Sequence, residues 1–546
     1  MIHLRSLGSL LFVALATLPL GAQTRTATRT LTLDEALSPG RFIPRSPIGL
    51  EWMSDGSAYT WFERTPGGIA WQKSRVQDGT TETLIDEKAF AAAAKEAGFE
   101  NLPLTAMVGA DWVEGAARIT HEGAVLRVQL DPFHIAKGRT FPADAEATAF
   151  SVGDDYVAWS KDKDVFVGKP DGTVFRVTQG GHEFLTHGLS VSRVEFGITD
   201  GLWWDPTGRR LAFYREDLRP IEPYPFLETE VRPARHRLDR YPMAGRPGSH
   251  VTIGVYDTRD DSILWLATDP TKDEYLTNVT WGPDGESLFV AHVNRDQNLM
   301  QLIRYGASDG KPQATLITEK DDQWIEPEHG PIFLPDGGGR FLWFSFRDGY
   351  RHLYLHEADG HLLQDGTPGD FDVMDFSGWR GGKSNEFFYQ ATGSDPREKH
   401  LFVSSMAAPL ADVAFDGDRT VRVEIKEGGV RRLGGDGGQH EASIAPDGKH
   451  VLDTWSRLGT TPVVDLLGSD GRKVRRVHEA SDPLEGVTLG KESFFTTKTD
   501  DGQDLHGYMI EPPERDEGRK YPVLLWVYSG PHSQFVRDEW MGGLGA

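Results

Sequence analysis

A tyrosine, Tyr528, stands at the end of an apolar run close to the carboxyl terminus. The run, Val523 to Val527, lies between Pro522 and Gly530-Pro531, which predicts a short buried strand that opens into a loop. Loops at the carboxyl ends of such strands are where α/β sheets place ligands and reacting groups. Tyr528 is therefore a candidate site residue, although its position alone favours a tyrosine of the core.

The pentapeptide Gly306-Ala-Ser-Asp-Gly310 fits the Gly-x-Ser-x-Gly pattern of a serine nucleophile, and no other stretch of the sequence does. A nucleophile elbow needs a strand before the serine and a helix after it. Here the strand-like segment Leu302 to Tyr305 is followed by Lys311-Pro312 and a second strand-like segment, Ala314 to Ile317. We interpret Ser308 as part of a hairpin turn, and we expect no Ser-Asp-His triad in this chain.

A second motif, His182-Glu183-Phe-Leu-Thr-His187, resembles a zinc-binding pattern with its histidines five residues apart. On a helix this spacing would turn the two side chains about 140° away from each other. The preceding Gly180-Gly181 also predicts a loop. We expect no metal and no cofactor, and we interpret the remaining histidines, His532 among them, as surface or core residues.

The charge balance limits the classes of partner. The chain has 82 acidic and 58 basic residues, a formal charge of −24, which repels nucleic acid and anionic membrane surfaces. No cysteine is present, which excludes disulfides and thiolate chemistry.

The amino terminus predicts export. Arg5 precedes an apolar segment, Leu7 to Leu20, which leads into a small-residue cleavage site at Gly21-Ala22-Gln23. The segment is shorter than the roughly 20 residues of a spanning helix, so a cleaved signal peptide over residues 1–22 is favoured over an uncleaved anchor. We expect a periplasmic or secreted protein with no membrane segment after cleavage.

A repeated pattern occupies most of the chain between these ends: a strand, a tight Pro-Asp-Gly-like turn, and another strand rich in aromatic and β-branched residues. The turns are at Ser54-Asp55-Gly56, Pro206-Thr207-Gly208, Pro283-Asp284-Gly285, Pro335-Asp336-Gly337 and Pro446-Asp447-Gly448. The interval from Pro283 to Pro335 is 52 residues, that from Pro335 to Pro446 is 111, and that from Pro206 to Pro283 is 77. Strand repeats of about 40 to 50 residues are typical of propeller blades, so we predict a β-propeller of seven or eight blades.

Three segments depart from the repeat. Asp86 to Gly98 predicts a surface helix, and the proline-rich Arg219 to Ser249 predicts an extended arm instead of a regular element. After Glu485 the sequence pattern changes, and Phe494 to Pro513 predicts a hairpin leading towards Tyr528. We therefore predict a propeller domain over residues 23–485 and a second domain over 486–546.

Several stretches together resemble the dipeptidyl peptidase IV branch of the prolyl oligopeptidase family. They are Gly201 to Phe213, Arg219 to Phe226, Arg240 to Gly245, Ser345 to Tyr354 and Tyr521 to Gln534. The resemblance implies that residues 486–546 begin an α/β-hydrolase peptidase domain, incomplete here, and that the propeller restricts access to it. It also implies that Tyr528 contributes to an oxyanion hole.

The same resemblance points to two substrate-binding residues in the propeller. In the family two adjacent glutamates bind the free amino terminus of the substrate. Here Glu195 matches one of them, whereas Val194 occupies the other position and Arg193 is adjacent. The alternative for Glu195 is an ion pair with Arg193. Arg351 matches an arginine that points into the substrate cavity, with an exposed surface arginine as the alternative.

Our first functional hypothesis is thus the substrate-gating portion of an exported serine peptidase that cleaves peptides from a free amino terminus. Without a nucleophile elbow the chain is expected to be inactive by itself, as a truncated record or a remnant. The partners would be peptides, and a homodimer is left open. The second hypothesis is a non-catalytic propeller that binds peptides or protein partners.

Overall fold

Antiparallel sheets follow one another along the computed structural model of the chain, which describes residues 29–38, 42–113, 115–269, 271–381, 385–406, 429–435, 437–528, 530 and 533–540. The described residues fall into two compact units. The propeller unit comprises Ser46–Arg457 and Pro462–Glu479, and the terminal unit comprises the described residues before Ser46, Leu458–Thr461 and those from Ala480 onward.

The propeller unit contains eight sheets, each a blade, and consecutive strands pair in every blade except the fourth. The first four blades are, in order, β1–β4 (Ile48–Trp52, Ala58–Thr65, Gly68–Arg75, Thr81–Asp86), β5–β8 (Asp111–Val113, Ala116–His121, Ala124–Leu130, Phe133–Thr140), β9–β12 (Ala147–Phe150, Val157–Lys161, Asp164–Gly168, Val174–Arg176) and the five-stranded β13, β14, β15, β18 and β19 (Leu185–His187, Leu202–Trp204, Arg210–Asp217, His250–Asp257, Ser262–Trp265).

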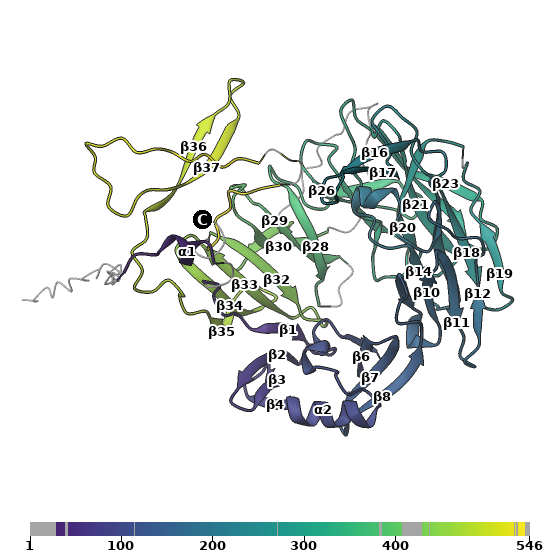
Figure 1. Ribbon diagram of the computed structural model, residues 1–546, viewed down its shortest axis with the longest axis horizontal. Helices are drawn as coiled ribbons and strands as arrows, with labels where there is room; N and C mark the ends of the chain where they lie inside the picture. The colour runs from purple at the N-terminus through teal and green to yellow at the C-terminus, as the bar shows by residue number, and fades with distance from the viewer. Residues whose placement is uncertain are drawn as a thin grey trace, which may run out of the picture. The chain divides into compact units, whose positions relative to one another are not determined.

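The other four blades are β20–β23 (Glu274–Trp281, Ser287–Asn294, Leu299–Gly306, Pro312–Lys320), β24–β27 (Ile332–Phe333, Phe341–Ser345, His352–His356, Leu362–Asp365), β28–β31 (Val373–Trp379, Glu386–Ala391, His400–Ser405, Val430–Leu433) and β32–β35 (Gln439–Ile444, His450–Arg457, Thr460–Gly468, Lys473–Glu479). The predicted propeller is confirmed, with eight blades. In Figure 1 the first strands β20, β28 and β32 lie towards the middle of the unit, and the fourth strands β23 and β35 lie further out.

Apolar side chains fill seven of the contacts between neighbouring blades. One of these clusters joins the first blade to the last, through Trp52 and Tyr59 on one side and Leu452 and Leu466 on the other. The contact between the second and third blades is instead polar: Arg118 and Arg127 donate to the buried carboxylate of Asp154, and Arg139 donates to its carbonyl oxygen.

The Pro-Asp-Gly-like turns lie between the first and second strands of their blades, as the repeat predicts. Gly208 and Gly285 have φ values of 70° and 68°, which glycine adopts without strain. A Cβ atom on Gly285 would lie only 3.0 Å from Asp205 Oδ2, because the turn of the fourth blade packs against that of the fifth.

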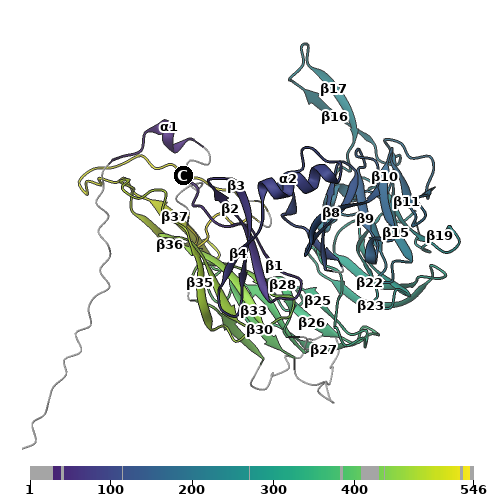
Figure 2. The same ribbon diagram turned by 90° about the horizontal axis from the view of Figure 1, so that it is seen from below.

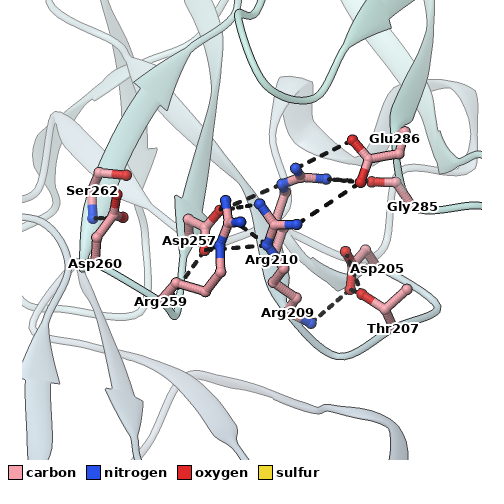
Figure 3. Close-up of polar contacts among 10 residues, drawn as sticks. All are labelled: Asp205, Thr207, Arg209, Arg210, Asp257, Arg259, Asp260, Ser262, Gly285 and Glu286. Carbon is pink, nitrogen blue, oxygen red and sulfur yellow. Dashed lines mark hydrogen bonds and ion pairs between the residues drawn. The ribbon is translucent and has the colours of Figure 1, made fainter.

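Paired charges hold these two turns together (Figure 3). Arg210 is buried and donates to the carbonyl oxygen of Gly285 at 2.7 Å and to Glu286 at 3.2 Å. Its neighbour Arg209 is more exposed and binds Asp257 at 2.9 Å, which also accepts from Arg259 at 2.8 Å. Arg210 therefore links the fourth blade to the fifth, whereas Arg209 pairs with Asp257 within the fourth blade.

The predicted helix is confirmed as α2 (Glu87–Glu96), between the first two blades. Its amino end is capped by Asp86, which accepts from the Ala89 amide at 2.7 Å, and it ends before Gly98, at φ 93°. Phe90, on its inner face, is buried in the apolar cluster that joins the blades, so the helix is part of this contact.

The proline-rich arm is more regular than the sequence predicted, which is a correction. β16 (Pro223–Glu228) and β17 (Arg235–Arg240) form an antiparallel hairpin that projects from the fourth blade (Figure 2). Prolines 223 and 225 are tolerated because they share one edge of a two-stranded ribbon, which has no further strand to pair with.

The terminal unit brings together segments distant in sequence. The Arg29 amide donates to Gly486 O at 3.3 Å, and Phe42, Leu484 and Val487 form a small core with Leu31 and Trp540. The unit also contains the short helix α1 (Leu33–Ala36) and the hairpin of β36 (Glu492–Lys498) and β37 (Asp504–Ile510), the latter as predicted. The boundary near residue 485 and an α/β-hydrolase domain over 486–546 stay predictions.

Within the part of the chain that the structure describes, no helix is long and apolar enough to cross a membrane. The predicted signal peptide and His532 lie outside the described residues.

Candidate functional site

The two predicted binding residues of the propeller, Glu195 and Arg351, lie in segments that leave the regular blades. Glu195 belongs to an excursion of the first strand of the fourth blade. The strand stops at Gly188, which donates to Tyr214 O at 2.8 Å, and resumes at Gly201, whose carbonyl oxygen accepts from the Tyr214 amide at 3.1 Å. Residues 189–200 are thus looped out of the strand that faces the middle of the unit.

This excursion contains η3 (Ser192–Gly197), whose backbone is unusual. Ser192, Arg193, Val194 and Phe196 have φ values of 53°, 55°, 61° and 55°, a left-handed conformation that is costly for β-branched Val194 above all. Strained backbone of this kind is concentrated at functional sites, where surrounding contacts maintain it.

Two contacts hold the strained segment. Glu216, buried on β15, accepts from the Ser192 amide at 2.9 Å and from Ser249 Oγ at 2.6 Å. Burial raises the pKa of Glu216, and these two hydrogen bonds oppose that rise. Phe196 is buried against Tyr275, with ring centroids 5.1 Å apart. The segment is therefore fixed from both sides.

The exposed part of η3 lines a hollow of about 260 Å³. Its charged lining residues are Glu195, Asp273 and Glu274 on the acidic side and Arg193 and Arg295 on the basic side. The Arg193 guanidinium lies 4.6 Å from the centre of the Tyr241 ring and forms no ion pair with Glu195. Among the described residues the Glu195 carboxylate has no hydrogen-bonding or ionic partner, which leaves it available to a ligand.

Arg351 lines a second hollow, of about 690 Å³, together with Trp324, Glu328, His329 and Phe344. Its guanidinium lies 3.4 Å from Glu328, donates to Met374 O at 3.2 Å and lies over the Phe344 ring at 4.6 Å. Burial lowers the pKa of Arg351, and the charge of Glu328 opposes this. The side chain is thus not the exposed surface arginine of the alternative interpretation.

The two hollows are close to each other. A Cβ atom on Gly197, at the end of η3, would lie 3.8 Å from the Glu328 carbonyl oxygen, and Asn278 Nδ2 donates to Pro327 O at 2.8 Å. The segment of Pro327 and Glu328, which lines the Arg351 hollow, therefore lies beside the end of η3.

Tyr528 lies in the terminal unit. No strand forms over Val523 to Val527, whose side chains are 71–90% exposed, so the predicted buried strand is not observed. A strand needs a neighbour with which to pair, and the structure provides none for this run. Tyr528 is 62% exposed and packs on Phe535 at 5.5 Å, which excludes a core tyrosine; its oxyanion role stays a prediction.

The two motifs rejected as catalytic or metal-binding lie in structural positions. Ser308 is in the turn between the antiparallel strands β22 and β23, which confirms the hairpin interpretation. His187 is buried on β13, with Nδ1 3.0 Å from Lys163 O and 3.1 Å from Asp164. Desolvation lowers its pKa.

Sequence reasoning missed most of the lining of the Glu195 hollow. Asp273, Tyr275 and Arg295 come from the fifth blade, and Tyr241 comes from the base of the arm. These residues show no motif spacing, because the packing of neighbouring blades brings them together. Only the places of Asp273, Arg295 and Tyr241 in loops between strands could have marked those three as candidates.

Comparison with known proteins matches residues 129–462 to the family model of the dipeptidyl peptidase IV (DPP IV) N-terminal region. The curated relatives include proteins named "Probable dipeptidyl-aminopeptidase B" from Phaeosphaeria nodorum, 26% identical over 439 residues, and from Tuber melanosporum, 27% identical over 442 residues. The match with the Phaeosphaeria protein covers 72% of this chain and 45% of that protein, so the chain spans about half the length of such relatives.

Solved structures share the fold. A candidate dipeptidyl aminopeptidase IV from Bacteroides ovatus superposes with a TM-score of 0.79 at 25% identity, covering 94% of this chain and 72% of that one. Dipeptidyl peptidase 4 of Porphyromonas gingivalis superposes with a TM-score of 0.75 at 22% identity and the same coverage.

Proposed function

The chain belongs to the family of the dipeptidyl peptidase IV N-terminal region, and we propose that it is the substrate-gating propeller of a serine peptidase that cleaves peptides from a free amino terminus. The observation that carries the proposal is the unpartnered Glu195 carboxylate, fixed on a strained excursion beside a hollow of about 260 Å³. A buried scaffold that maintains an unpaired charge in this way is suited to an ionic ligand.

The hollow favours a cation. Three acidic and two basic side chains line it, and one of the basic groups, Arg193, lies over Tyr241 instead of neutralising Glu195. A peptide ammonium group would donate charge-assisted hydrogen bonds to Glu195. Because Val194 stands where the family has a second acid, we expect weaker recognition of the amine than two carboxylates would give.

We propose that Arg351 contacts the same peptide from the neighbouring hollow. Among the described residues its guanidinium makes a single hydrogen bond, to Met374 O, and Nη2, which is paired with Glu328 at 3.4 Å, makes none. A peptide carbonyl oxygen is the complementary acceptor. Glu195 and Arg351 would then bind the amino terminus and a following peptide group respectively.

In the complete enzyme Tyr528 would donate from its phenol to the oxyanion of the tetrahedral intermediate, a contribution typically worth about 10²- to 10³-fold in rate. We expect this chain alone to hydrolyse nothing. Its one Gly-x-Ser-x-Gly segment is a hairpin turn, and neither α-helix of the described chain follows such a segment. Export, supported by Arg5 and the apolar Leu7 to Leu20, is part of the proposal.

The hairpin position of Ser308 also favours a second candidate, a non-catalytic propeller that binds peptides. This second candidate would bind peptides at the same site as the peptidase but would not hydrolyse them. A complete gene product that releases dipeptides from chromogenic substrates would decide for the peptidase, and one that binds but releases nothing would decide for the second candidate.

Titration calorimetry with a short peptide, its amino terminus free or acetylated, tests the binding site. We expect the wild type to prefer the free amine and Glu195→Gln to lose about tenfold in affinity, since a hydrogen bond to a charged group contributes about 1.5–3 kcal/mol. Glu100→Gln, an exposed carboxylate near α2, is the control and should bind like the wild type. Equal affinity for both peptides would reject the site.

A complementary variant adds what the hollow lacks. Val194→Glu supplies a second carboxylate and removes a β-branched residue from a φ of 61°. We expect it to bind the free-amine peptide more tightly and the acetylated peptide unchanged. Unaltered affinity for both would show that the Val194 position does not face the amine.

A further inference from the structure

Three side chains of the sixth blade converge on one point. His352, fully buried at the start of β26, has Nδ1 3.0 Å from Asp348 Oδ2 and 3.9 Å from Asp365 Oδ2. The ligand atoms of the three residues all lie within 4.8 Å of one another. Asp348 is on the exposed loop before β26 and Asp365 ends β27, so the point is reachable from solvent.

Each of the two carboxylates accepts a backbone hydrogen bond through one oxygen and directs the other oxygen towards His352. Asp348 Oδ1 accepts from the Tyr350 amide at 3.2 Å, and Asp365 Oδ1 accepts from the Thr367 amide at 3.0 Å. In both residues Oδ2 is the atom that faces His352. The backbone therefore orients two anionic oxygens towards one ring nitrogen.

The other ring nitrogen fixes the orientation of the imidazole. His352 Nε2 lies 3.1 Å from the Phe371 carbonyl oxygen, which can only accept, so Nε2 carries the proton. Histidines that bind metal ions usually donate their second nitrogen to a carbonyl or a carboxylate in this way, which directs the lone pair of the first towards the ion.

Two buried hydroxyls beside the cluster lack partners. Tyr354 pairs across the strands with Asp365, so their side chains share one face, and its hydroxyl is buried without a hydrogen bond. The Tyr389 hydroxyl is likewise buried and unpaired. After burial, the charge of Asp365 is the next cause that raises the pKa of each phenol, so both lie within its field. Buried hydroxyls without partners are costly, and here they border the acidic point.

We propose that Asp348, His352 and Asp365 bind one divalent transition-metal ion, with Zn²⁺ and Mn²⁺ as the best matches to one imidazole and two carboxylates. Protein ligands of such an ion lie about 2.0–2.2 Å from it, so the three atoms need to move inward only slightly. The Tyr354 hydroxyl, or a water bound to it, completes the coordination. Arg347, the nearby cation, is already paired with Glu319 at 2.8 Å.

A second buried histidine shows what a simple ion pair looks like in this fold. His440 Nδ1 lies 3.0 Å from both oxygens of one carboxylate, Asp453, and Nε2 lies 3.2 Å from Gly437 O. No second acid approaches among the described residues. At His352, by contrast, two carboxylates each direct one oxygen towards the ring. A simple ion pair needs only one carboxylate, so the second acid is the feature that favours a metal ion.

The test uses the purified chain after treatment with a chelator, titrated with Zn²⁺ and separately with Mn²⁺. Calorimetry should give one site per chain, and Mn²⁺ binding should appear in the electron paramagnetic resonance spectrum. Asp365→Asn should weaken binding at this site by at least about tenfold, the range observed when a metal site loses a supporting group. Asp453→Asn, the matched control, should bind as the wild type does.

Thermal unfolding provides a readout independent of stoichiometry. The ion should raise the Tm of the wild type and of Asp453→Asn but not that of Asp365→Asn, because a ligand stabilises only the state that binds it. Asp348→Asn, at an exposed position, keeps the test valid if the buried variant fails to fold. Wild-type protein that binds neither ion, or binding that Asp348→Asn and Asp365→Asn leave unchanged, would overturn the proposal.

Discussion

His356 illustrates how a buried side chain of the sixth blade sets a pH limit. Its Nδ1 lies 2.9 Å from the Gly360 carbonyl oxygen, to which it donates, and its ring stacks on Phe341 at 5.4 Å. Nε2 is buried with no hydrogen-bond partner. Burial lowers the pKa of His356 to about 4, so the folded protein keeps the ring neutral.

The pH dependence follows from the sign of this shift. Between the ordinary value and about 4 the unfolded chain binds the proton and the folded chain does not, so the free energy of unfolding falls as the pH falls. From pH 7 to pH 5 this site should cost about 2 kcal/mol. Measured by urea unfolding over the same pH interval, the free energy of unfolding of His356→Asn should fall by about 2 kcal/mol less than that of the wild type. Parallel profiles for the two proteins would refute this assignment.

The candidate site shows which residues a sequence reveals. Glu195 and Arg351 were found because they stand in stretches that resemble a family, and the structure places each beside a hollow. The sequence did not single out Asp348, His352 and Asp365, the residues of the proposed metal site. Their spacing fits no motif, because the hairpin of β26 and β27 brings Asp365 close to residues that are distant from it in the sequence.

At the scale of elements, the turn chemistry was the most reliable guide. The turn glycines, which adopt positive φ, could be recognised in the sequence, so the hairpins and the order of the blades could be predicted. The helix could be predicted as well. The regular arm, the polar contact at Asp154 and the docking of residues 29–45 onto 484–540 could not. Each depends on partners far away in the sequence.

Arg209 and Arg210 offer a matched comparison of a partly exposed ion pair within the fourth blade and a buried tie to the fifth blade (Figure 3). Arg210→Met should cost about 1–3 kcal/mol, because it leaves the buried Gly285 carbonyl oxygen without its donor. Arg209→Met should cost under about 1 kcal/mol, since its ion pair with Asp257 is partly solvated. Urea unfolding of both variants measures the difference, and equal costs would contradict it.

At the scale of the whole molecule, the terminal unit exposes a run of consecutive apolar side chains. The described residues of the propeller unit expose no comparable run. Val523 to Val527 are 71–90% exposed and form no strand. We expect limited chymotrypsin digestion to cut after Leu524, Trp526 or Tyr528 while the propeller remains intact, and we expect the chain to self-associate. Leu525→Lys should reduce light scattering. Resistance of the whole chain to digestion would contradict this prediction.

Every blade of the propeller is formed by consecutive segments of the chain, and among the described residues no strand of the last blade comes from the beginning of the chain. The circle is joined at the Trp52 and Leu452 cluster by side chains alone, without a shared ladder of backbone hydrogen bonds. Pulled at residues 46 and 479, the unit should therefore part at this joint first, at low force, and reseal when released. A joint of this kind lets the ring of blades open without breaking the backbone hydrogen bonds within any blade.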